Sequence, residues 1–209
     1  MSITIDLLTP DKHEEYERLL QSVDYSLLYA SVRFRRFLES VLAHSVSTYL
    51  CAFEDKALVG ALPAFLCRNS RLGNVLNSLP FFGSNGGMIQ SPRARDGQGI
   101  RLRLIQAFHS LAREEAVVAS TIISNPLQPL AEFYGRHSGA TLHDERIGQI
   151  TPLPPLQPEA SLADRLAETF HAKTRNHFRK AQKSGFALER GNSPQAFDAL
   201  AAIHRRNMN

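Results

Sequence analysis

The densest group of charged residues in this 209-residue sequence lies between residues 173 and 185. It contains five cations and no carboxylate: Lys173, Arg175, Arg179, Lys180 and Lys183. On a helix, residues four apart share one stripe, so Arg175, Arg179 and Lys183 would form a positive stripe, with His177 in the stripe beside it. Like charges at this spacing repel each other by a few tenths of a kcal/mol per pair. The pattern therefore predicts a helix that binds an external anion such as phosphate; the alternative is the solvated basic face of an ordinary surface helix.

The order of residues in this stretch also resembles a known pattern. Residues 173–185 read Lys-x-Arg-Asn-x-x-Arg-Lys-Ala-x-Lys-x-Gly, and a strand-like segment follows at 186–189. This resembles the linker-helix signature of the FemAB family, whose members are aminoacyl or acyl transferases built from two tandem domains of the GNAT acetyltransferase fold. The resemblance implies that phosphates of the acceptor or of a tRNA are bound by Lys173, Arg175, Arg179 and Lys180.

A glycine-rich stretch at residues 79–89 resembles the Pro-Phe-Gly-Ser-x-Gly-Gly stretch of the first domains of this family. Three glycines within five residues permit positive φ angles and allow backbone amides to approach a ligand closely. The alternative is a tight connection between strands. If the resemblance holds, one wall of the substrate cleft is formed by Gly83, Ser84, Asn85 and Gly86.

The family also has a basic contact to the substrate's phosphates in the region after its first helix. In this chain the predicted helix 31–43 carries Arg33 and Arg36, which are the candidates for that contact. The apolar side of this helix is expected to face inward with Phe34, Phe37, Leu38, Val41 and Leu42. The alternative for each arginine is an ordinary surface position on an amphipathic helix.

Residues 94–99 (Ala-Arg-Asp-Gly-Gln-Gly) precede a predicted helix, 101–115. The Gly-x-Gly resembles the pyrophosphate loop of acetyltransferases, Gln/Arg-x-x-Gly-x-Gly/Ala, in which amides at a helix N-terminus hold coenzyme A. Ala94 stands where that pattern has Gln or Arg, and the flanking arginines are one residue out of register. We therefore expect a domain that keeps the fold without a coenzyme, as first domains of FemAB-like proteins usually do; acetyl-CoA or another acyl-CoA is the alternative.

Hydrophobic periodicity predicts a mixture of strands and helices. Strands are expected at 2–8, 47–53, 57–67, 117–123 and 142–153, the fourth of them buried, and helices after Pro10 and at 31–43, 101–115 and 129–137. The hairpin with its acidic turn at 54–56 resembles the central hairpin of GNAT folds. The expected fold class is α+β and GNAT-like, with a mixed, mostly antiparallel sheet flanked by helices.

The best domain boundary is the cluster of prolines at residues 152–158. We predict a first GNAT-like domain at 1–156, followed at 157–209 by linker helices and the start of a second GNAT-like domain. Because the one strand and one helix after Gly185 cannot bury a core by themselves, we expect the chain to be the upstream part of a longer transferase.

The net charge of +4 and the isoelectric point near 9.3 permit binding of phosphates, nucleic acid or an acidic membrane surface without selecting one of them. The sequence has no run of eighteen apolar residues and no secretion signal, so we expect a cytoplasmic protein with no integral membrane segment, for which peripheral membrane association is open. Cys51 and Cys67 are the only cysteines, and we expect neither a disulfide nor a metal site.

The leading hypothesis is a FemAB-like transferase without a cofactor. It would move an aminoacyl or acyl group from an activated donor, aminoacyl-tRNA, to an amine of a phosphate-bearing cell-envelope precursor such as a peptidoglycan peptide. In this chemistry the amine attacks the ester directly, so catalysis depends on positioning and on stabilising the oxyanion; the catalytic residues stay unassigned. One alternative is a CoA-dependent N-acyltransferase in polysaccharide biosynthesis. Another is a non-catalytic module whose basic helix binds nucleic acid or anionic lipid.

Overall fold

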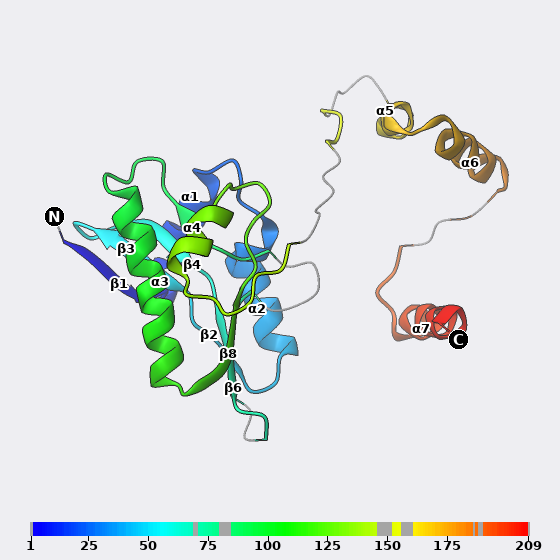
Figure 1. The fold of residues 1–209 in the computed structure, drawn as a ribbon. Coiled ribbons are helices and arrows are strands. Elements are labelled where there is room, and N and C mark those ends of the chain that lie inside the picture. The colour runs from blue at the N-terminus through cyan, green and yellow to red at the C-terminus, as the bar shows by residue number, and fades with distance from the viewer. Residues whose placement is uncertain are drawn as a thin grey trace. The chain divides into compact units, whose positions relative to one another are not determined.

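A computed structural model of the chain describes residues 2–68, 71–79, 85–145, 152–155, 161–185, 187 and 190–208. The chain divides into two compact units, Met1–Gly148 and Gln149–Asn209, and each is described by itself. Figure 1 labels many of their helices and strands. Among the helices of the described residues, none is both long enough and apolar enough to cross a membrane.

Three long strands form the framework of the first unit, and each is divided into two parts. The parts are β2 (Ser45–Ser47) and β3 (Leu50–Glu54), β4 (Ala57–Leu62) and β5 (Phe65–Cys67), and β6 (Asn74–Ser78) and β7 (Ile89–Gln90), of which the last two are separated by residues 79–88. The parts belong to two four-stranded sheets, with the strand orders β1-β3-β4-β7 and β2-β5-β6-β8. The first two interruptions lie at the same level, because Ser47 pairs with Phe65 and Leu50 pairs with Leu62. Pro63, which has no N–H to donate to a ladder, lies where the second strand is interrupted.

The two outer strands complete the sheets. β1 (Ile3–Leu7) is antiparallel to β3, and β8 (Val117–Ile122) is parallel to β6. A parallel pair needs a crossover connection, which is supplied by the 18-residue helix α3 (Gly97–Glu114). The β3–β4 hairpin turns at Asp55 and Lys56, whose φ angles of 47° and 71° are those of a type I′ turn. The predicted hairpin is confirmed.

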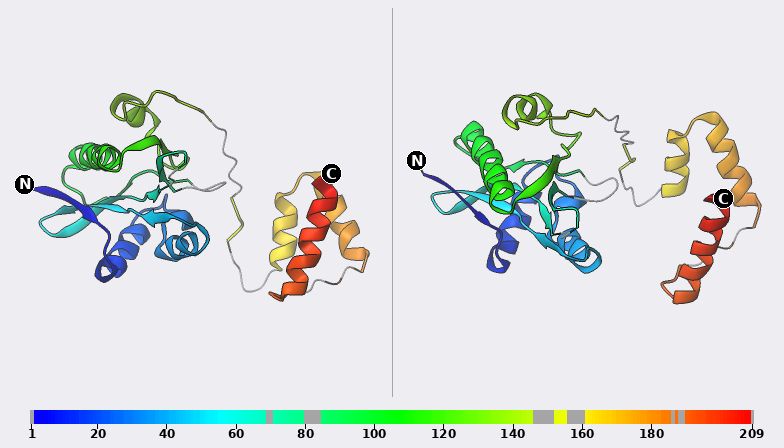
Figure 2. Two further views of the ribbon diagram at one scale, coloured as in Figure 1. Left: turned by 90° about the horizontal axis from the view of Figure 1, so that it is seen from below. Right: turned by 60° about the horizontal axis from the view of Figure 1, so that its bottom comes forward.

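Helices cover both faces of the strands. Figure 2 (left) shows α3 on one face and α1 (His13–Gln21) and α2 (Val32–Val41) on the other. The α3 face buries Leu62, Leu66, Leu76, Ile100, Leu104 and Phe108, and the opposite face buries Tyr16, Leu19, Leu38, Cys51, Ala61 and Phe65. Shorter helices are α4 (Ala131–His137) and the 3₁₀ turns η1 (Pro10–Lys12) and η2 (Leu28–Ala30). The predicted α+β class is confirmed.

Two expectations about burial are wrong. The strand predicted to be buried at 117–123 is an outer strand, β8, and the side chain of Val118 is 67% exposed. On α2, Phe37 and Val41 are half exposed because the inward stripe runs through Arg35. The guanidinium carbon of Arg35 lies 5.2 Å from the centroid of the Tyr49 ring, and the aliphatic part of such a side chain can cover apolar surface.

Two predicted strands lie partly outside the described residues. In the predicted strand 142–153, residues 142–145 and 152–153 are described and form no strand. In the segment 186–189 only residue 187 is described, and it is not in a strand.

The second unit contains three helices in its described part: α5 (Leu162–Thr169), α6 (Ala172–Lys183) and α7 (Pro194–Met208). Phe170 and Phe178 meet at the corner between α5 and α6, where their ring centroids lie 6.2 Å apart with the rings nearly perpendicular. Gly185 follows α6 with a φ angle of 67°, which is the left-handed conformation that ends many helices. The basic stretch therefore forms the predicted helix and ends at the predicted residue.

Candidate functional site

Helix α6 presents the predicted cations on its surface. Lys173, Arg179 and Lys180 are exposed, and Arg175 is partly buried, with its Nη1 donating to the carbonyl oxygen of Glu168 at 3.4 Å. Every ion pair between described residues lies in the first unit, so no cation of α6 is neutralised by a carboxylate of the described chain. Four positive side chains on one short helix can bind a phosphate through charge-assisted hydrogen bonds.

The other two candidate arginines lie on α2 in the first unit, where Arg33 and Arg36 are exposed. Arg35 is the arginine of this helix that contacts other parts of the first unit. Its Nε pairs with Glu39 at 3.0 Å, and its Nη1 donates to the carbonyl oxygen of Leu8 at 3.3 Å. Contact of Arg33 or Arg36 with a substrate stays a prediction.

The glycine-rich stretch lies between β6 and β7, where the third strand is interrupted. Asn85 and Gly86 are described there, whereas Gly83 and Ser84 lie outside the described residues. Leu79 is the first residue of this segment, and its side chain is fully buried. Its φ angle of 56° is a left-handed conformation, which costs a residue with a side chain about 1–2 kcal/mol. Such outliers occur preferentially at binding and catalytic sites, which makes this interruption a candidate site.

Two side chains hold the backbone where the third strand resumes. Ser78 Oγ accepts a hydrogen bond from the Gly87 N–H at 2.8 Å, and Tyr134 Oη on α4 accepts one from the Met88 N–H at 2.8 Å. A Cβ atom at Gly86 would lie 2.2 Å from Ser78 Oγ, so this position has no room for a side chain. Burial raises the pKa of Tyr134, which keeps its hydroxyl protonated at neutral pH.

Asn125 and Tyr25 extend this polar group. Asn125 Nδ2 donates to the carbonyl oxygen of Tyr25 at 2.6 Å, and Tyr25 Oη both accepts from the Gln90 N–H at 3.0 Å and donates to the Gln90 carbonyl at 3.1 Å. Sequence reasoning did not find Tyr25, Ser78, Asn125 or Tyr134. Their bonds mostly join residues 46 to 100 positions apart, and no local pattern carries that information.

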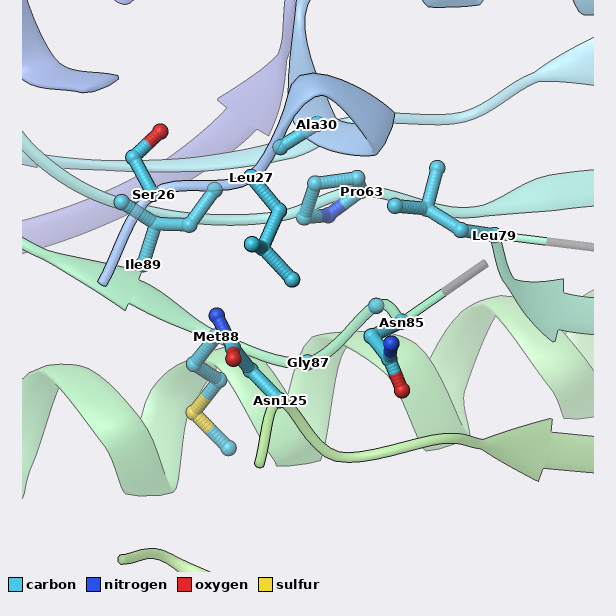
Figure 3. A pocket seen from close by; sticks show the side chains of 11 residues that line it. Ser26, Leu27, Ala30, Pro63, Leu79, Asn85, Gly87, Met88, Ile89 and Asn125 are labelled. Atoms are coloured by element: carbon cyan, nitrogen blue, oxygen red, sulfur yellow. The ribbon is translucent and has the colours of Figure 1, made fainter. Parts of the chain in front are cut away.

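A small hollow lies beside this polar group, as Figure 3 shows. Leu27 and Pro63 form one side of it, and Asn85, Gly87 and Asn125 form the other. Its volume of about 10 Å³ is the space of a single water molecule. At this place the described residues therefore enclose no more room than one water molecule needs.

Replacing Tyr134 by phenylalanine is expected to lower the free energy of unfolding by about 1–3 kcal/mol, because the Met88 N–H would stay buried without its acceptor. Tyr49→Phe is the matched control. Tyr49 Oη is also buried but has no hydrogen-bond partner among the described residues, so its loss should cost less than about 0.5 kcal/mol. Urea unfolding of both variants measures the difference, and equal losses would contradict the role given to Tyr134.

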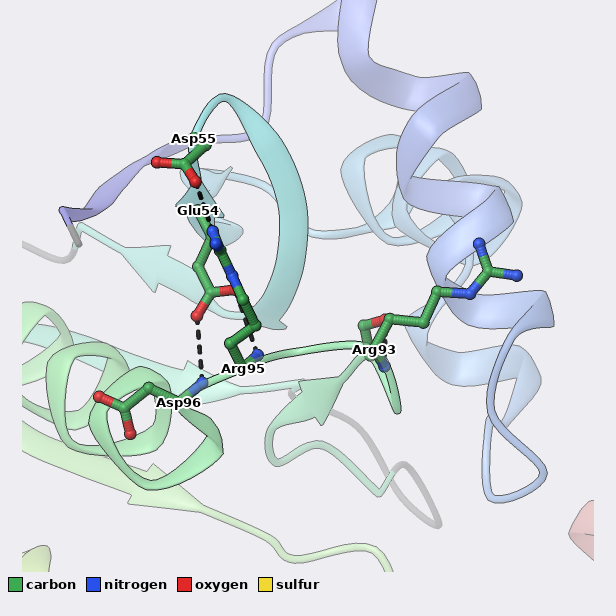
Figure 4. A network of polar contacts seen from close by, with 6 residues as sticks. Glu54, Asp55, Arg93, Arg95 and Asp96 are labelled. Atoms are coloured by element: carbon green, nitrogen blue, oxygen red, sulfur yellow. Dashed lines mark hydrogen bonds and ion pairs between the residues drawn. The ribbon is translucent and has the colours of Figure 1, made fainter.

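The start of α3 forms a second polar group, drawn in Figure 4. The helix begins at Gly97, one turn before the predicted start, and Asp96 Oδ1 accepts from the Gly99 N–H at 2.8 Å. Glu54, at the end of β3, accepts from the N–H groups of Arg95 and Asp96, each at 3.2 Å. The Arg95 side chain turns back onto the hairpin, where it pairs with Glu54 at 3.5 Å and with Asp55, whose pKa it lowers by hydrogen bonding.

Metal ligands and cysteines are the remaining reactive groups of the described residues. Among the described residues, no three His, Cys, Asp or Glu side chains lie close enough together to hold a metal ion. Cys51 and Cys67 are both free thiols. Burial raises the pKa of the Cys51 thiol to about 12, so it is not a thiolate nucleophile at neutral pH.

Comparison with known proteins was informative only at the level of structure, since no family model and no curated protein matches the sequence. The aminoglycoside acetyltransferase AAC(6')-Iy, in complex with the bisubstrate analogue CoA-S-monomethyl-acetylneamine, matches with a TM-score of 0.50 at 14% identity, over 73% of this chain and 99% of that one. An aminoglycoside acetyltransferase from an uncultured soil metagenomic sample matches with a TM-score of 0.50 at 14% identity, over 73% and 97%. A transcriptional regulator from Bacillus halodurans C-125 matches with a TM-score of 0.50 at 16% identity, over 71% and 100%.

The fold is that of the GNAT acetyltransferases. The predicted GNAT-like architecture is thereby confirmed. Similarity at these identities shows the fold alone, so the closer resemblance to the FemAB family stays a prediction. Among the described residues of this fold, polar side chains hold the backbone both between β6 and β7 and at the start of α3.

Proposed function

We propose that this chain belongs to an acyltransferase that moves an acyl group from an activated donor to an amine. The observation that carries the proposal is the GNAT fold, in which β6 and β8 pair in parallel and α3 connects them. Several solved structures with a similar fold are named as acetyltransferases. Because a fold alone does not determine a reaction, the proposal also relies on the α6 cations and on the strained backbone at Leu79.

For the donor and acceptor we propose aminoacyl-tRNA and an amine of a phosphate-bearing cell-envelope precursor, such as a peptidoglycan peptide. Support comes from the residue pattern of α6, which resembles the FemAB linker helix. In this role Lys173, Arg175, Arg179 and Lys180 bind phosphates of one of the two substrates. Their lack of carboxylate partners within the described chain leaves them available for that contact.

The proposed reaction needs no covalent enzyme intermediate. The lone pair of the acceptor amine attacks the carbonyl carbon of the aminoacyl ester, and a tetrahedral intermediate with an oxyanion forms. When it collapses, the C–O bond to the tRNA ribose breaks, the ribose oxygen leaves with a proton from the amine, and an amide remains. The protein's task is to orient the two substrates and to place hydrogen-bond donors at the oxyanion.

A CoA-dependent N-acyltransferase, acting in polysaccharide biosynthesis, is the second candidate. The observation in its favour is the structural similarity to acetyltransferases, one of which is in complex with an analogue containing coenzyme A. The same fold and the same attack of an amine would serve, with a thioester in place of the ribose ester. The start of α3 argues against this candidate for the first unit, because carboxylates already occupy amides of its pyrophosphate-like loop.

The two candidates are separated by offering the protein two labelled donors, aminoacyl-tRNA and acetyl-CoA, each with an amine-bearing peptidoglycan precursor. We expect label to reach the acceptor from aminoacyl-tRNA and not from acetyl-CoA. Transfer from acetyl-CoA alone would favour the second candidate. Absence of transfer from both donors, by protein that is shown to be folded, would contradict the proposal of acyl transfer.

A further inference from the structure

The loop before α3 is where a GNAT fold would be expected to hold a nucleotide pyrophosphate. Residues 94–99 lead into an 18-residue helix, and the N–H groups at such a terminus attract anions through their direction and through the helix dipole. A bound pyrophosphate would need these N–H groups as donors. Their present partners therefore decide whether the site is available.

Most of the loop's donors are already used inside the protein. The Ala94 N–H donates to the carbonyl oxygen of Ser91 at 3.1 Å. Three further N–H groups donate to carboxylates, those of Arg95 and Asp96 to Glu54 and that of Gly99 to Asp96. Thus four of the six N–H groups of residues 94–99 have a partner within the chain, and three of these four donate to the carboxylates of Glu54 and Asp96.

The carboxylate of Glu54 is buried against the N–H groups of this loop. It is only 5% exposed, and each of its two carboxylate oxygens accepts one of the loop's N–H groups. The Arg95 side chain, which could otherwise bind a phosphate, lies 3.5 Å from Glu54 and also pairs with Asp55. Figure 4 shows both hairpin carboxylates directed at the loop, with Arg93 directed away from them.

We propose that Glu54 is the resident anion of the α3 terminus and takes the place of a coenzyme pyrophosphate in this unit. A pyrophosphate entering here would have to displace Glu54, leave a buried carboxylate without donors, and lie beside Asp96. The residues of the loop therefore do not fit coenzyme A. Instead, Glu54 joins the tip of the β3–β4 hairpin to the start of α3. The inference depends on the GNAT fold and not on the donor proposed above.

The experiment has two parts, and the first uses the Arg175→Ala/Arg179→Ala variant, so that the phosphate site proposed on α6 does not contribute. Isothermal titration of this variant with coenzyme A and with inorganic pyrophosphate should give no saturable binding at concentrations up to about 1 mM, which corresponds to a binding free energy weaker than about −4 kcal/mol. Micromolar binding of coenzyme A that displaces Glu54 would overturn the inference. It would leave acyl transfer itself untouched, so the two proposals fail independently.

The second part removes the resident anion and supplies one from solution. Glu54→Ala should melt at a lower temperature than the unaltered protein, and acetate or pyrophosphate should restore several degrees of that loss relative to chloride at equal ionic strength. Asp55→Asn is the matched control, because Asp55 pairs with Arg95 but accepts no N–H of the loop in the bonds described here. Asp55→Asn should show no anion-specific rescue. Asparagine is chosen because it tolerates the left-handed conformation that Asp55 has in the turn.

Glu54→Gln keeps the shape of the side chain and removes only its charge, so it remains informative if Glu54→Ala does not fold. We expect its melting temperature to lie between those of Glu54→Ala and the unaltered protein. If Glu54→Gln has the same melting temperature as the unaltered protein and Glu54→Ala shows no anion-specific rescue, Glu54 is not the anion of this terminus.

Discussion

The double variant Arg175→Ala/Arg179→Ala is expected to bind tRNA about 30 times more weakly than the unaltered protein at low ionic strength, a change of about 2 kcal/mol. The two arginines lie four residues apart on α6, so they are neighbours on one stripe and can contact the same phosphate or adjacent ones. Each lost contact should also reduce the slope of affinity against salt concentration by about 0.7–0.9. Fluorescence anisotropy with labelled tRNA over a series of salt concentrations measures both quantities.

The matched control removes the same charge from the same unit. Arg205 and Arg206 lie in the last turn of α7, and Arg205→Ala/Arg206→Ala changes the net charge equally. If α6 is a defined phosphate site, this control should keep affinity within about threefold. The same titration with a lipid-linked peptidoglycan precursor shows whether α6 contacts the acceptor instead. Equal losses in both double variants would mean that α6 contributes only general positive charge.

Replacing Phe108 by alanine is expected to lower the free energy of unfolding of the first unit by about 3–5 kcal/mol. Phe108 is 1% exposed on the inner face of α3, within the cluster that also contains Leu62 and Leu104. Its removal takes apolar area out of the core and leaves a cavity that the surrounding strands can fill only in part. Since a small unit has a total stability of about 5–15 kcal/mol, the variant should be close to unfolding at room temperature.

Phe37→Ala provides the same chemical change at a half-exposed position of the same unit. Phe37 is 49% exposed on α2, so the loss should be less than about 1.5 kcal/mol. The sequence contains no tryptophan whose fluorescence could report unfolding. Urea unfolding of both variants is therefore followed by far-ultraviolet circular dichroism. A cost at Phe37 as large as that at Phe108 would contradict the description of α2 and restore the sequence-based expectation that Phe37 faces inward.

Local features of this chain could be predicted from its sequence. The basic helix ends where Gly185 permits a left-handed residue, and the β3–β4 hairpin turns at Asp55 and Lys56, within the predicted turn 54–56. Both features are determined by neighbouring residues, through the spacing of charges in one case and the turn conformation in the other. This hairpin is also one of the segments whose resemblance indicates a GNAT-like fold, beside the basic helix.

Features that depend on distant residues could not be predicted. The start of α3 was placed too late, because Gly97 and Gly99 are weak helix formers and the carboxylate of Glu54 comes from a strand some forty residues earlier. On α2, the sequence predicts an apolar inward side, but Arg35 packs over Tyr49 on that side. Both errors arise where a polar side chain finds its partner only after the sheet has formed.

The most direct test of the account is the chemical identity of the product. Intact-mass and fragment-ion spectrometry of an amine-bearing peptidoglycan precursor, incubated with the protein and aminoacyl-tRNA, should show a gain of one aminoacyl group joined by an amide bond at the amine. Acceptor whose amine has been blocked beforehand should show no gain. An unchanged acceptor mass with aminoacyl-tRNA and with acetyl-CoA, for folded protein that binds tRNA through α6, would contradict acyl transfer and leave a module that only binds anions.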